Sequence, residues 1–369
     1  MKGSLLLFAG LALVVSLLAW VRAPNFVWAW KLAILVGEFG HWLVLLPLGL
    51  AVLVGFGPAG VGRLATLVLC GVAMAGFLRP ALNAWWLGRS MGDGAFSFAR
   101  LYFHEKPPVV AVRTEVFVRP DNQELKLDFY SAKAATDRPA ACIVVIHGGG
   151  WDGGDRMQLA EWNQRLAAQG YAVAAISYRL APQFIWPAQR EDVGAAIDWL
   201  KAHAGELGLD PTRLILLGRS AGGQIAAAVG YGRHDPAIRG VIALYAPHDM
   251  PFAWSVSSED DALNSVKLMR QYFGGPPDTP ERLTRYESAS GQLLATKDSP
   301  PTLLIHGVAD TLAWYRHSDR LAARLRELGV RHEYLRLPWV THGFDFNPNG
   351  PAGQLADRAL TRFLAEVTR

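Results

Sequence analysis

The chain has 369 residues, of which 51% are hydrophobic and 18% are charged, and its mean hydropathy is +0.15. This charged fraction lies below the roughly one quarter typical of soluble domains, which indicates a membrane-associated part in addition to one full-sized globular domain. The formal charge is +4, but the lysines and arginines form no run or stripe, so nothing indicates a nucleic-acid partner. Cys70 and Cys142 both read as small buried residues, so we expect no disulfide framework.

The first 86 residues are the apolar part. Three stretches, at about 4–21, 39–57 and 62–78, are long and uncharged enough to predict transmembrane helices. A cleaved signal peptide is the alternative for the first stretch, but Ala19 to Ala23 make a poor cleavage site and more apolar sequence follows. Tryptophans at the ends of these stretches, including Trp30 and Trp42, fit the aromatic enrichment of the headgroup level.

The charges around these stretches predict an orientation. Lys31, Glu38 and His41 are expected in an interfacial loop between the first two spans. With three spans, Lys2 and Arg63 fall on one side, and the more basic other side carries Arg22, Lys31, Arg79, Arg89 and Arg100. The positive-inside rule then predicts a multi-pass protein whose large domain faces the cytoplasm, and the lipid bilayer becomes a predicted partner.

The globular domain is predicted at 109–369, after a connector at 87–108 that contains a Lys-Pro-Pro break. Alternating residues predict antiparallel edge strands at 112–118 and 125–130. Unbroken apolar runs then predict buried strands at 142–146, 171–176, 214–217, 241–245 and 302–305. Amphipathic stretches at 158–169, 188–203, 222–231 and 317–328 separate them. This alternation predicts an α/β fold with a mostly parallel sheet, whose chemistry lies just after each apolar run.

The candidate nucleophile is Ser220, in the sequence Gly218-Arg219-Ser220-Ala221-Gly222. A predicted strand precedes this Gly-x-Ser-x-Gly motif and a predicted helix follows it, which is the context of a nucleophile elbow. The glycines allow a sharp, strained turn that side chains would obstruct. A glycine-rich turn with an incidental serine is the alternative.

The candidate oxyanion hole follows the strand at 142–146, in the sequence His-Gly-Gly-Gly-Trp at 147–151. A phosphate loop would need a following lysine and a serine or threonine, and this segment has neither. We therefore predict Gly149, Gly150 and Ala221 as backbone donors to a developing oxyanion, with Gly148 shaping the loop. His147 is predicted to be a structural hydrogen-bonding residue.

A serine nucleophile needs a base that an acid orients, and both follow the serine in this type of sheet. Asp310 stands after the strand at 302–305, and His342 stands in a loop after the apolar run at 334–337. Asp249 is the serious rival for the acid. The rival histidines are His248, His306 and His332. We rank Asp310 and His342 first and expect His306 to be structural.

Metal and cofactor chemistry has no support in the sequence. The chain lacks a His-Glu-x-x-His motif, a cysteine cluster and grouped histidines and aspartates at ligand spacing. It also lacks a nicotinamide or flavin fingerprint, so we expect no cofactor and no metal.

Taken together, the motifs resemble the hormone-sensitive-lipase-like and acetyl-esterase branch of the α/β-hydrolases, including its feruloyl and acetyl-xylan esterase-like group. The resemblance covers about 109–369, and its motifs lie at 147–151, 177–182, 186–187, 191–192, 210–211, 218–223, 310 and 342–344. It implies Ser220, Asp310 and His342 as the triad, with the oxyanion donors named above. Arg219 departs from the aspartate often found in the lipase-like branch. The segment at about 250–290 is similar to the cap of such enzymes, which shapes the substrate pocket.

The predicted function is a membrane-anchored serine hydrolase that cleaves small carboxylic esters, with a lipophilic ester plausible from the location. The same triad could cleave an amide or formamide, since the 147–151 motif is also similar to formamidase relatives. A catalytically silent binding module is the third hypothesis. The sequence specifies neither the physiological substrate nor the oligomeric state.

Overall fold

The computed structural model describes residues 2–103, 106–133 and 138–369. The chain divides into two compact units. The helical unit comprises 1–105 together with two short segments from later in the chain, 307–312 and 336–361. The α/β unit comprises 106–306, 313–335 and 362–369.

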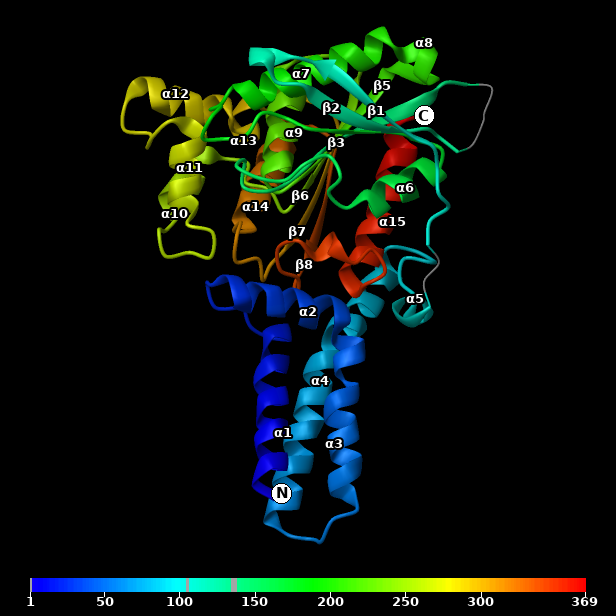
Figure 1. Cartoon of the computed structure of the whole chain (residues 1–369), viewed down its shortest axis with the longest axis vertical. Helices are drawn as coiled ribbons and strands as arrows, with labels where there is room; N and C mark the ends of the chain where they lie inside the picture. The colour runs from blue at the N-terminus through cyan, green and yellow to red at the C-terminus, as the bar shows by residue number, and fades with distance from the viewer. Residues whose placement is uncertain (1, 104–105, 134–137) are drawn as a thin grey trace. The chain divides into compact units, whose positions relative to one another are not determined.

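The N-terminal part of the helical unit consists of apolar helices. They are α1 (Lys2–Ser16), the 3-10 turn η1 (Leu17–Ala19), α2 (Val27–Leu43), α3 (Leu45–Gly55), α4 (Val61–Ser90) and the short α5 (Phe98–Tyr102). Helices α1, α3 and α4 run side by side, whereas α2 runs across their ends (Figure 1). Large apolar side chains are exposed along α1, α3 and α4, at Leu7, Val14, Leu53, Leu64 and Val68 among others.

The stretch at 39–57, which is predicted as one transmembrane helix, is divided in the structure into the end of α2 and the whole of α3. The two helices meet at Val44 with a bend of 46°. Pro47 explains the break, because a proline ring collides with the carbonyl group four residues earlier, which here belongs to Leu43, the last residue of α2.

The prediction that Lys31, Glu38 and His41 lie in an interfacial loop is wrong. All three lie on α2, and Glu38 and His41 are buried. A helix can bury a polar residue that finds a partner from another segment. The imidazole Nε2 of His41 lies 3.1 Å from the carbonyl oxygen of Leu101.

One helix of the described residues, α4, is both long and apolar enough to cross a membrane. The bent pair α2 and α3 passes the same test only if the two helices are counted as one broken span, and α1 is apolar but shorter. At 1.5 Å per residue, α4 extends about 45 Å, which exceeds the roughly 30 Å of a hydrocarbon core.

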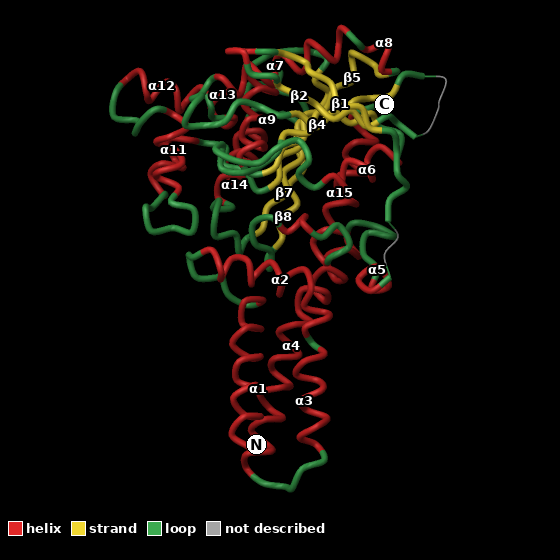
Figure 2. The backbone as a smooth tube through the Cα atoms, in the orientation of Figure 1, coloured by secondary structure: helices red, strands yellow, loops and turns green. Residues whose placement is uncertain are grey.

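The α/β unit contains a sheet that has eight strands in the described part of the chain (Figure 2). In chain order these are β1 (Val112–Val118), β2 (Leu125–Tyr130), β3 (Ala140–Ile146), β4 (Ala172–Ile176), β5 (Leu209–Arg219), β6 (Ile238–Leu244), β7 (Thr302–Gly307) and β8 (His332–Leu337). Their order across the sheet is β1-β2-β4-β3-β5-β6-β7-β8. The strands β1, β2 and β4 pair antiparallel, and β4-β3-β5-β6-β7 pair parallel. The predicted mostly parallel sheet is confirmed, and both predicted strands at 112–118 and 125–130 are antiparallel. Of these two, only β1 is an edge strand, because β2 pairs with β1 on one side and with β4 on the other.

Helices cover both faces of this sheet. They are α6 (Ala160–Ala168), α7 (Ala188–Ala202), α8 (Ala204–Leu207), α9 (Ala221–Gly232), α14 (Arg316–Glu327) and α15 (Pro351–Val367). Gly230 of α9 packs on Val241 of β6, whereas the neighbouring Gly240 faces Phe363 of α15. Successive strand residues point to opposite faces, so α9 and the end of α15 lie on opposite sides of the sheet.

The segment expected to form a cap lies between β6 and β7 and is helical. It contains α10 (Met250–Val256), α11 (Ser265–Phe273) and α12 (Pro280–Ser288), and α13 (Gly291–Leu294) follows it. A role for this segment in the substrate pocket stays a prediction.

Both cysteines are buried, as expected, and burial raises the pKa of the Cys142 thiol to about 12.

Candidate active site

Ser220 stands at a sharp turn between β5 and α9. Its backbone has φ +52° and ψ −119°, a conformation that L-residues rarely adopt. Hydrogen bonds hold the turn on both sides: the N–H of Ser220 donates to the carbonyl oxygen of Leu244 over 2.9 Å, and its carbonyl oxygen accepts from Gly223 over 2.9 Å. The strained backbone is therefore fixed by β6 and by the first turn of α9, which is the geometry of a nucleophile elbow.

The glycines around Ser220 are required by close packing. A Cβ atom at Gly222 would collide with the carbonyl oxygens of Ile146 and His147 at the end of β3. A Cβ atom at Gly223 would lie 2.7 Å from the Cβ atom of Ala246. Because of these glycines, α9 starts directly against the ends of β3 and β6, and its first N–H groups lie beside Ser220.

The loop at 147–151 packs against the elbow. A Cβ atom at Gly148 would lie 3.0 Å from the carbonyl oxygen of Arg219 and 3.4 Å from the Cβ atom of Ser220. Gly149 and Gly150 have φ of +125° and +63°, values that favour glycine. The carbonyl oxygen of Gly149 accepts from the N–H of Gly153 over 3.0 Å, which closes the loop into a tight turn.

The backbone amides of this loop have different partners. The N–H of Gly148 donates to the side-chain oxygen of Gln158 over 2.8 Å, so it is already used to hold the loop. No acceptor within the described part of the chain receives the N–H of Gly149, Gly150 or Ala221. These are the amides expected to bind an oxyanion, and they are available for that role.

Aromatic residues fix the far end of the loop. The indole N–H of Trp151 donates to the side-chain oxygen of Gln224 on α9 over 2.8 Å, and the indole stacks on Tyr272 with ring centroids 4.6 Å apart. His147 stacks on Tyr178 at 4.1 Å. Burial lowers the pKa of His147 to about 4, so the ring is neutral at neutral pH and has a structural position, as expected.

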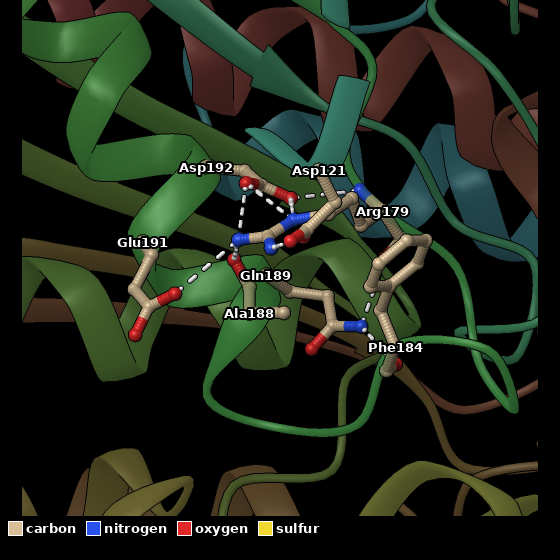
Figure 3. A network of polar contacts seen from close by, with 7 residues as sticks. All are labelled: Asp121, Arg179, Phe184, Ala188, Gln189, Glu191 and Asp192. Atoms are coloured by element: carbon tan, nitrogen blue, oxygen red, sulfur yellow. Dashed lines mark hydrogen bonds and ion pairs between the residues drawn. The ribbon is translucent and has the colours of Figure 1, made fainter. Parts of the chain in front are cut away.

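An ion network built around the buried pair of Arg179 and Asp192 holds the segment that follows β4 (Figure 3). The guanidinium of Arg179 lies among the carboxylates of Asp192, Asp121 and Glu191, at 2.9, 2.8 and 3.2 Å. The side-chain amide of Gln189 donates to the carbonyl oxygen of Arg179 over 2.8 Å. This segment contacts the loop at 147–151, since the N–H of Ala181 donates to the carbonyl oxygen of Trp151 over 3.0 Å.

Asp310 and His342 lie together in the helical unit. The Nδ1 atom of His342 lies 2.7 Å from the Oδ2 atom of Asp310, and both side chains are buried. The other carboxylate oxygen, Oδ1, accepts from the N–H of Leu312 over 2.8 Å. With Nδ1–H donating to the carboxylate, the Nε2 atom is left as the basic nitrogen, which is the tautomer that a general base requires.

The rival residues have other contacts. The Oδ1 atom of Asp249 caps α10 by accepting from the N–H of Phe252 over 3.0 Å, and its other oxygen pairs with Arg320. The ring nitrogens of His306 lie 2.8 Å from the hydroxyl of Ser318 and 3.0 Å from the carbonyl oxygen of Ala313. The Nδ1 atom of His332 contacts the carbonyl oxygen of Val330. His248 is fully buried, and its pKa is held well below its usual value by desolvation.

The structure thus brings the predicted site residues together in two groups. Ser220 and Ala221 belong to one elbow in the α/β unit, and Gly149 and Gly150 follow Gly148, which packs against it. Asp310 and His342 form a hydrogen-bonded pair in the helical unit. Trp30 and Glu38 of α2 contact the segment that carries His342. No sequence motif indicates this role for either residue.

Comparison with known proteins places this arrangement in a family. The sequence model of the BD-FAE family matches residues 127–325. The chain belongs to the BD-FAE family. It is 30% identical over 272 residues to esterase LipC of Mycobacterium tuberculosis, covering 70% of this chain and 66% of the relative. It is 28% identical to the probable carboxylic ester hydrolase LipM of the same organism, over 62% of this chain and 54% of LipM.

Solved structures show the fold of this BD-FAE member. The carboxylesterase EstE1 from a metagenomic library aligns with a TM-score of 0.61 and 24% identity, covering 78% of this chain and 98% of EstE1. The α/β-hydrolase fold and the resemblance to the hormone-sensitive-lipase-like branch are therefore confirmed. The chain spans less than two thirds of the length of LipC and LipM.

Proposed function

We propose that this BD-FAE member hydrolyses carboxylic esters through an acyl-enzyme, with Ser220 as nucleophile, His342 as general base and Asp310 as orienting acid. The observation that carries the proposal is the elbow itself: Ser220 is held at φ +52° between β5 and α9, with the glycine loop packed against it. A strained backbone of this kind persists only where the surroundings enforce it, and it presents the hydroxyl to a substrate.

The proposed reaction has two steps. The Ser220 hydroxyl attacks the ester carbonyl while His342 takes its proton, and the oxyanion accepts hydrogen bonds from Gly149, Gly150 and Ala221. The C–O bond breaks, and the alcohol leaves with the proton from His342. A water then attacks the acyl-enzyme with His342 again as base, which releases the acid and restores the Ser220 hydroxyl.

Esters are favoured over amides because the relatives named above are called esterases and an ester hydrolase. The test compares purified full-length protein in detergent on p-nitrophenyl butyrate and on an N-formyl aromatic amine. Ser220→Ala is expected to abolish ester turnover and labelling by a fluorophosphonate. Ser90→Ala, at an exposed serine of α4, is the control and is expected to keep full turnover.

The outcomes separate the hypotheses. Unchanged ester turnover in Ser220→Ala would overturn the assignment of the nucleophile. Faster turnover of the N-formyl amine than of the ester would replace the esterase with a formamidase-like enzyme. Failure of the wild-type protein to react with the fluorophosphonate would indicate a silent binding module.

We also propose that the N-terminal helices attach the enzyme to a bilayer, with α4 as the spanning element. The support is the length of α4 and the row of exposed apolar side chains on α1, α3 and α4. Arg79 of α4 contacts the carbonyl oxygen of Ala19 and the ring of Trp20, a grouping suited to the headgroup level. A small lipophilic ester is the substrate class that such a location would supply.

The membrane proposal is tested by flotation of the full chain with phospholipid vesicles after washing at alkaline pH. Val72→Lys places a charge on α4 at a side chain that is 49% exposed, and it is expected to lower the floated fraction, since a central lysine costs about 3 kcal/mol. Val112→Lys, at a valine of β1 with 45% exposure, is the matched control. A wild-type chain that stays at the bottom of the gradient would contradict the proposal.

A further inference from the structure

Helix α2 contacts the peptide that carries the candidate general base. The indole N–H of Trp30 donates to the main-chain carbonyl oxygen of His342 over 2.9 Å. The next residue, Gly343, has φ +75°, and a Cβ atom there would lie 3.7 Å from Ile34 and 3.8 Å from the Trp30 ring. The backbone on both sides of this carbonyl group therefore rests on α2.

A second contact lies further along the same helix. Trp30, Ile34 and Glu38 are four residues apart and so share one face of α2. The main-chain oxygen of Glu38 accepts from the side-chain amide of Asn347 over 3.3 Å. This face consequently follows the chain from His342 through the η3 turn (Phe344–Phe346) to the start of α15.

The Glu38 carboxylate ends on the first turn of α15. Its Oε2 atom accepts from the N–H of Ala352 over 3.3 Å, and only 1% of the residue is exposed. A Cβ atom at Gly350 would collide with this oxygen, so the glycine leaves room for it. The first N–H groups of a helix have no partner within the helix, and a carboxylate from another element can satisfy them. Glu38 therefore anchors the far end of the segment that starts at His342.

The following part of the N-terminal region adds contacts to α15. The N–H of Ser97 donates to the side-chain oxygen of Gln354 over 2.8 Å, and Arg100 pairs with Asp357 at 3.2 Å. The α2 contacts thus belong to a continuous packing of residues before 105 on residues after 341, all within the helical unit.

We propose that α2 is a positioning element of the active site, in which Trp30 and Glu38 hold the 342–352 segment so that His342 keeps its hydrogen bond to Asp310. The proposal rests on the function proposed above. Asp310 fixes the imidazole at Nδ1, whereas Trp30 fixes the main chain of the same residue. A displacement of about 1 Å in a catalytic group can lower a rate about 100-fold. The helices before residue 105 would then contribute to turnover as well as to membrane attachment.

The test uses the full chain in detergent with a soluble ester. Trp30→Phe removes the donor and keeps an aromatic ring, and it is expected to lower kcat about 10- to 100-fold with KM nearly unchanged. Trp28→Phe makes the same change two residues away on the same helix, where the side chain is 75% exposed, and it is expected to match wild type. Labelling of Ser220 by a fluorophosphonate should be slower in Trp30→Phe than in wild type, and unchanged in Trp28→Phe.

Glu38 provides an independent pair of variants. Glu38→Gln keeps an acceptor oxygen for the N–H of Ala352 and is expected to retain most of kcat, whereas Glu38→Leu removes it and should lower kcat as Trp30→Phe does. A loss caused only by weaker folding would appear in the thermal midpoint and would scale with it across the variants. If Trp30→Phe fails to fold, the Glu38 pair still decides the question.

The results distinguish the two proposals. Wild-type kcat in both Trp30→Phe and Glu38→Leu, with Ser220→Ala inactive, would overturn the positioning role and leave the esterase intact. Unchanged turnover in Ser220→Ala would overturn the proposed function and the positioning role with it.

Discussion

The indole of Trp30 and the main-chain carbonyl group of His342 are joined by a 2.9 Å hydrogen bond, although the two residues are 312 positions apart. Trp30 belongs to the apolar N-terminal region and His342 to the hydrolase part of the chain. The bond means that the N-terminal region is part of the surroundings of the candidate base. Deletion of residues 1–105 would therefore remove contacts from the segment that carries His342 as well as the proposed membrane anchor.

The identity of the orienting acid can be decided by a pair of variants. Asp310→Asn is expected to lower kcat about 10³- to 10⁴-fold, because an amide no longer holds the Nδ1–H tautomer of His342. Asp249→Asn is expected to keep kcat within about twofold, since it caps α10 and pairs with Arg320. Steady-state kinetics on a p-nitrophenyl ester measures both, and the reverse ranking would assign the role to Asp249.

The oxyanion loop is expected to be sensitive to a single methyl group. Gly149→Ala places a Cβ atom against the carbonyl oxygen of Gly153 at a residue with φ +125°, which displaces the loop. We expect kcat to fall about 100- to 1000-fold, as for the loss of one oxyanion donor. Gly205→Ala in α8 has open space around the added methyl group and serves as the control. A Gly149→Ala enzyme with wild-type kcat would remove Gly149 from the proposed oxyanion hole.

The ion network at Arg179 is expected to stabilise the fold without taking part in the reaction. Arg179→Lys cannot reproduce the contacts with Asp192, Asp121 and Glu191 and should lower the free energy of unfolding by about 2 to 4 kcal/mol. The same change at Arg113, whose side chain is 46% exposed in its pairs with Glu115 and Glu206, should leave the free energy of unfolding nearly unchanged. Chemical denaturation measures both values, and equal losses would show that burial of the network adds nothing.

Acid should destabilise the α/β unit through His147. The pKa of this ring is about 4 in the folded protein because of burial, below its ordinary value of 6.5. As the pH falls below 6.5, His147 binds a proton in the unfolded chain, whereas in the folded protein it does so only near pH 4. The free energy of unfolding therefore decreases between pH 6.5 and about 4. The full loss is about 3 kcal/mol. Urea midpoints at the two ends of this range should differ less in His147→Gln, and an identical pH dependence in wild type and variant would exclude His147 as the cause.

Local patterns in the sequence were sufficient for much of this protein. The strands at 112–118 and 125–130 have the bounds that the sequence predicts, because alternation of apolar and polar residues is typical of a strand. The turn at Ser220 was predicted because a sharp strand-to-helix turn needs glycines at fixed spacing, and the structure shows what those glycines contact. The two strands and the turn depend on residues that are neighbours in the sequence. They can therefore be predicted before the tertiary structure is known.

What the sequence alone determined is the hydrolase sheet, its glycine turns and the order of the candidate residues along the chain. Only the tertiary structure showed that Asp310 contacts His342 whereas Asp249 contacts Arg320, since both acids follow a strand. It also decided that α2 is a helix with Glu38 buried, where the sequence predicts an interfacial loop. The reason is physical: a buried polar group is stable only with its partner, and the partners of Trp30 and Glu38 lie more than 300 residues away.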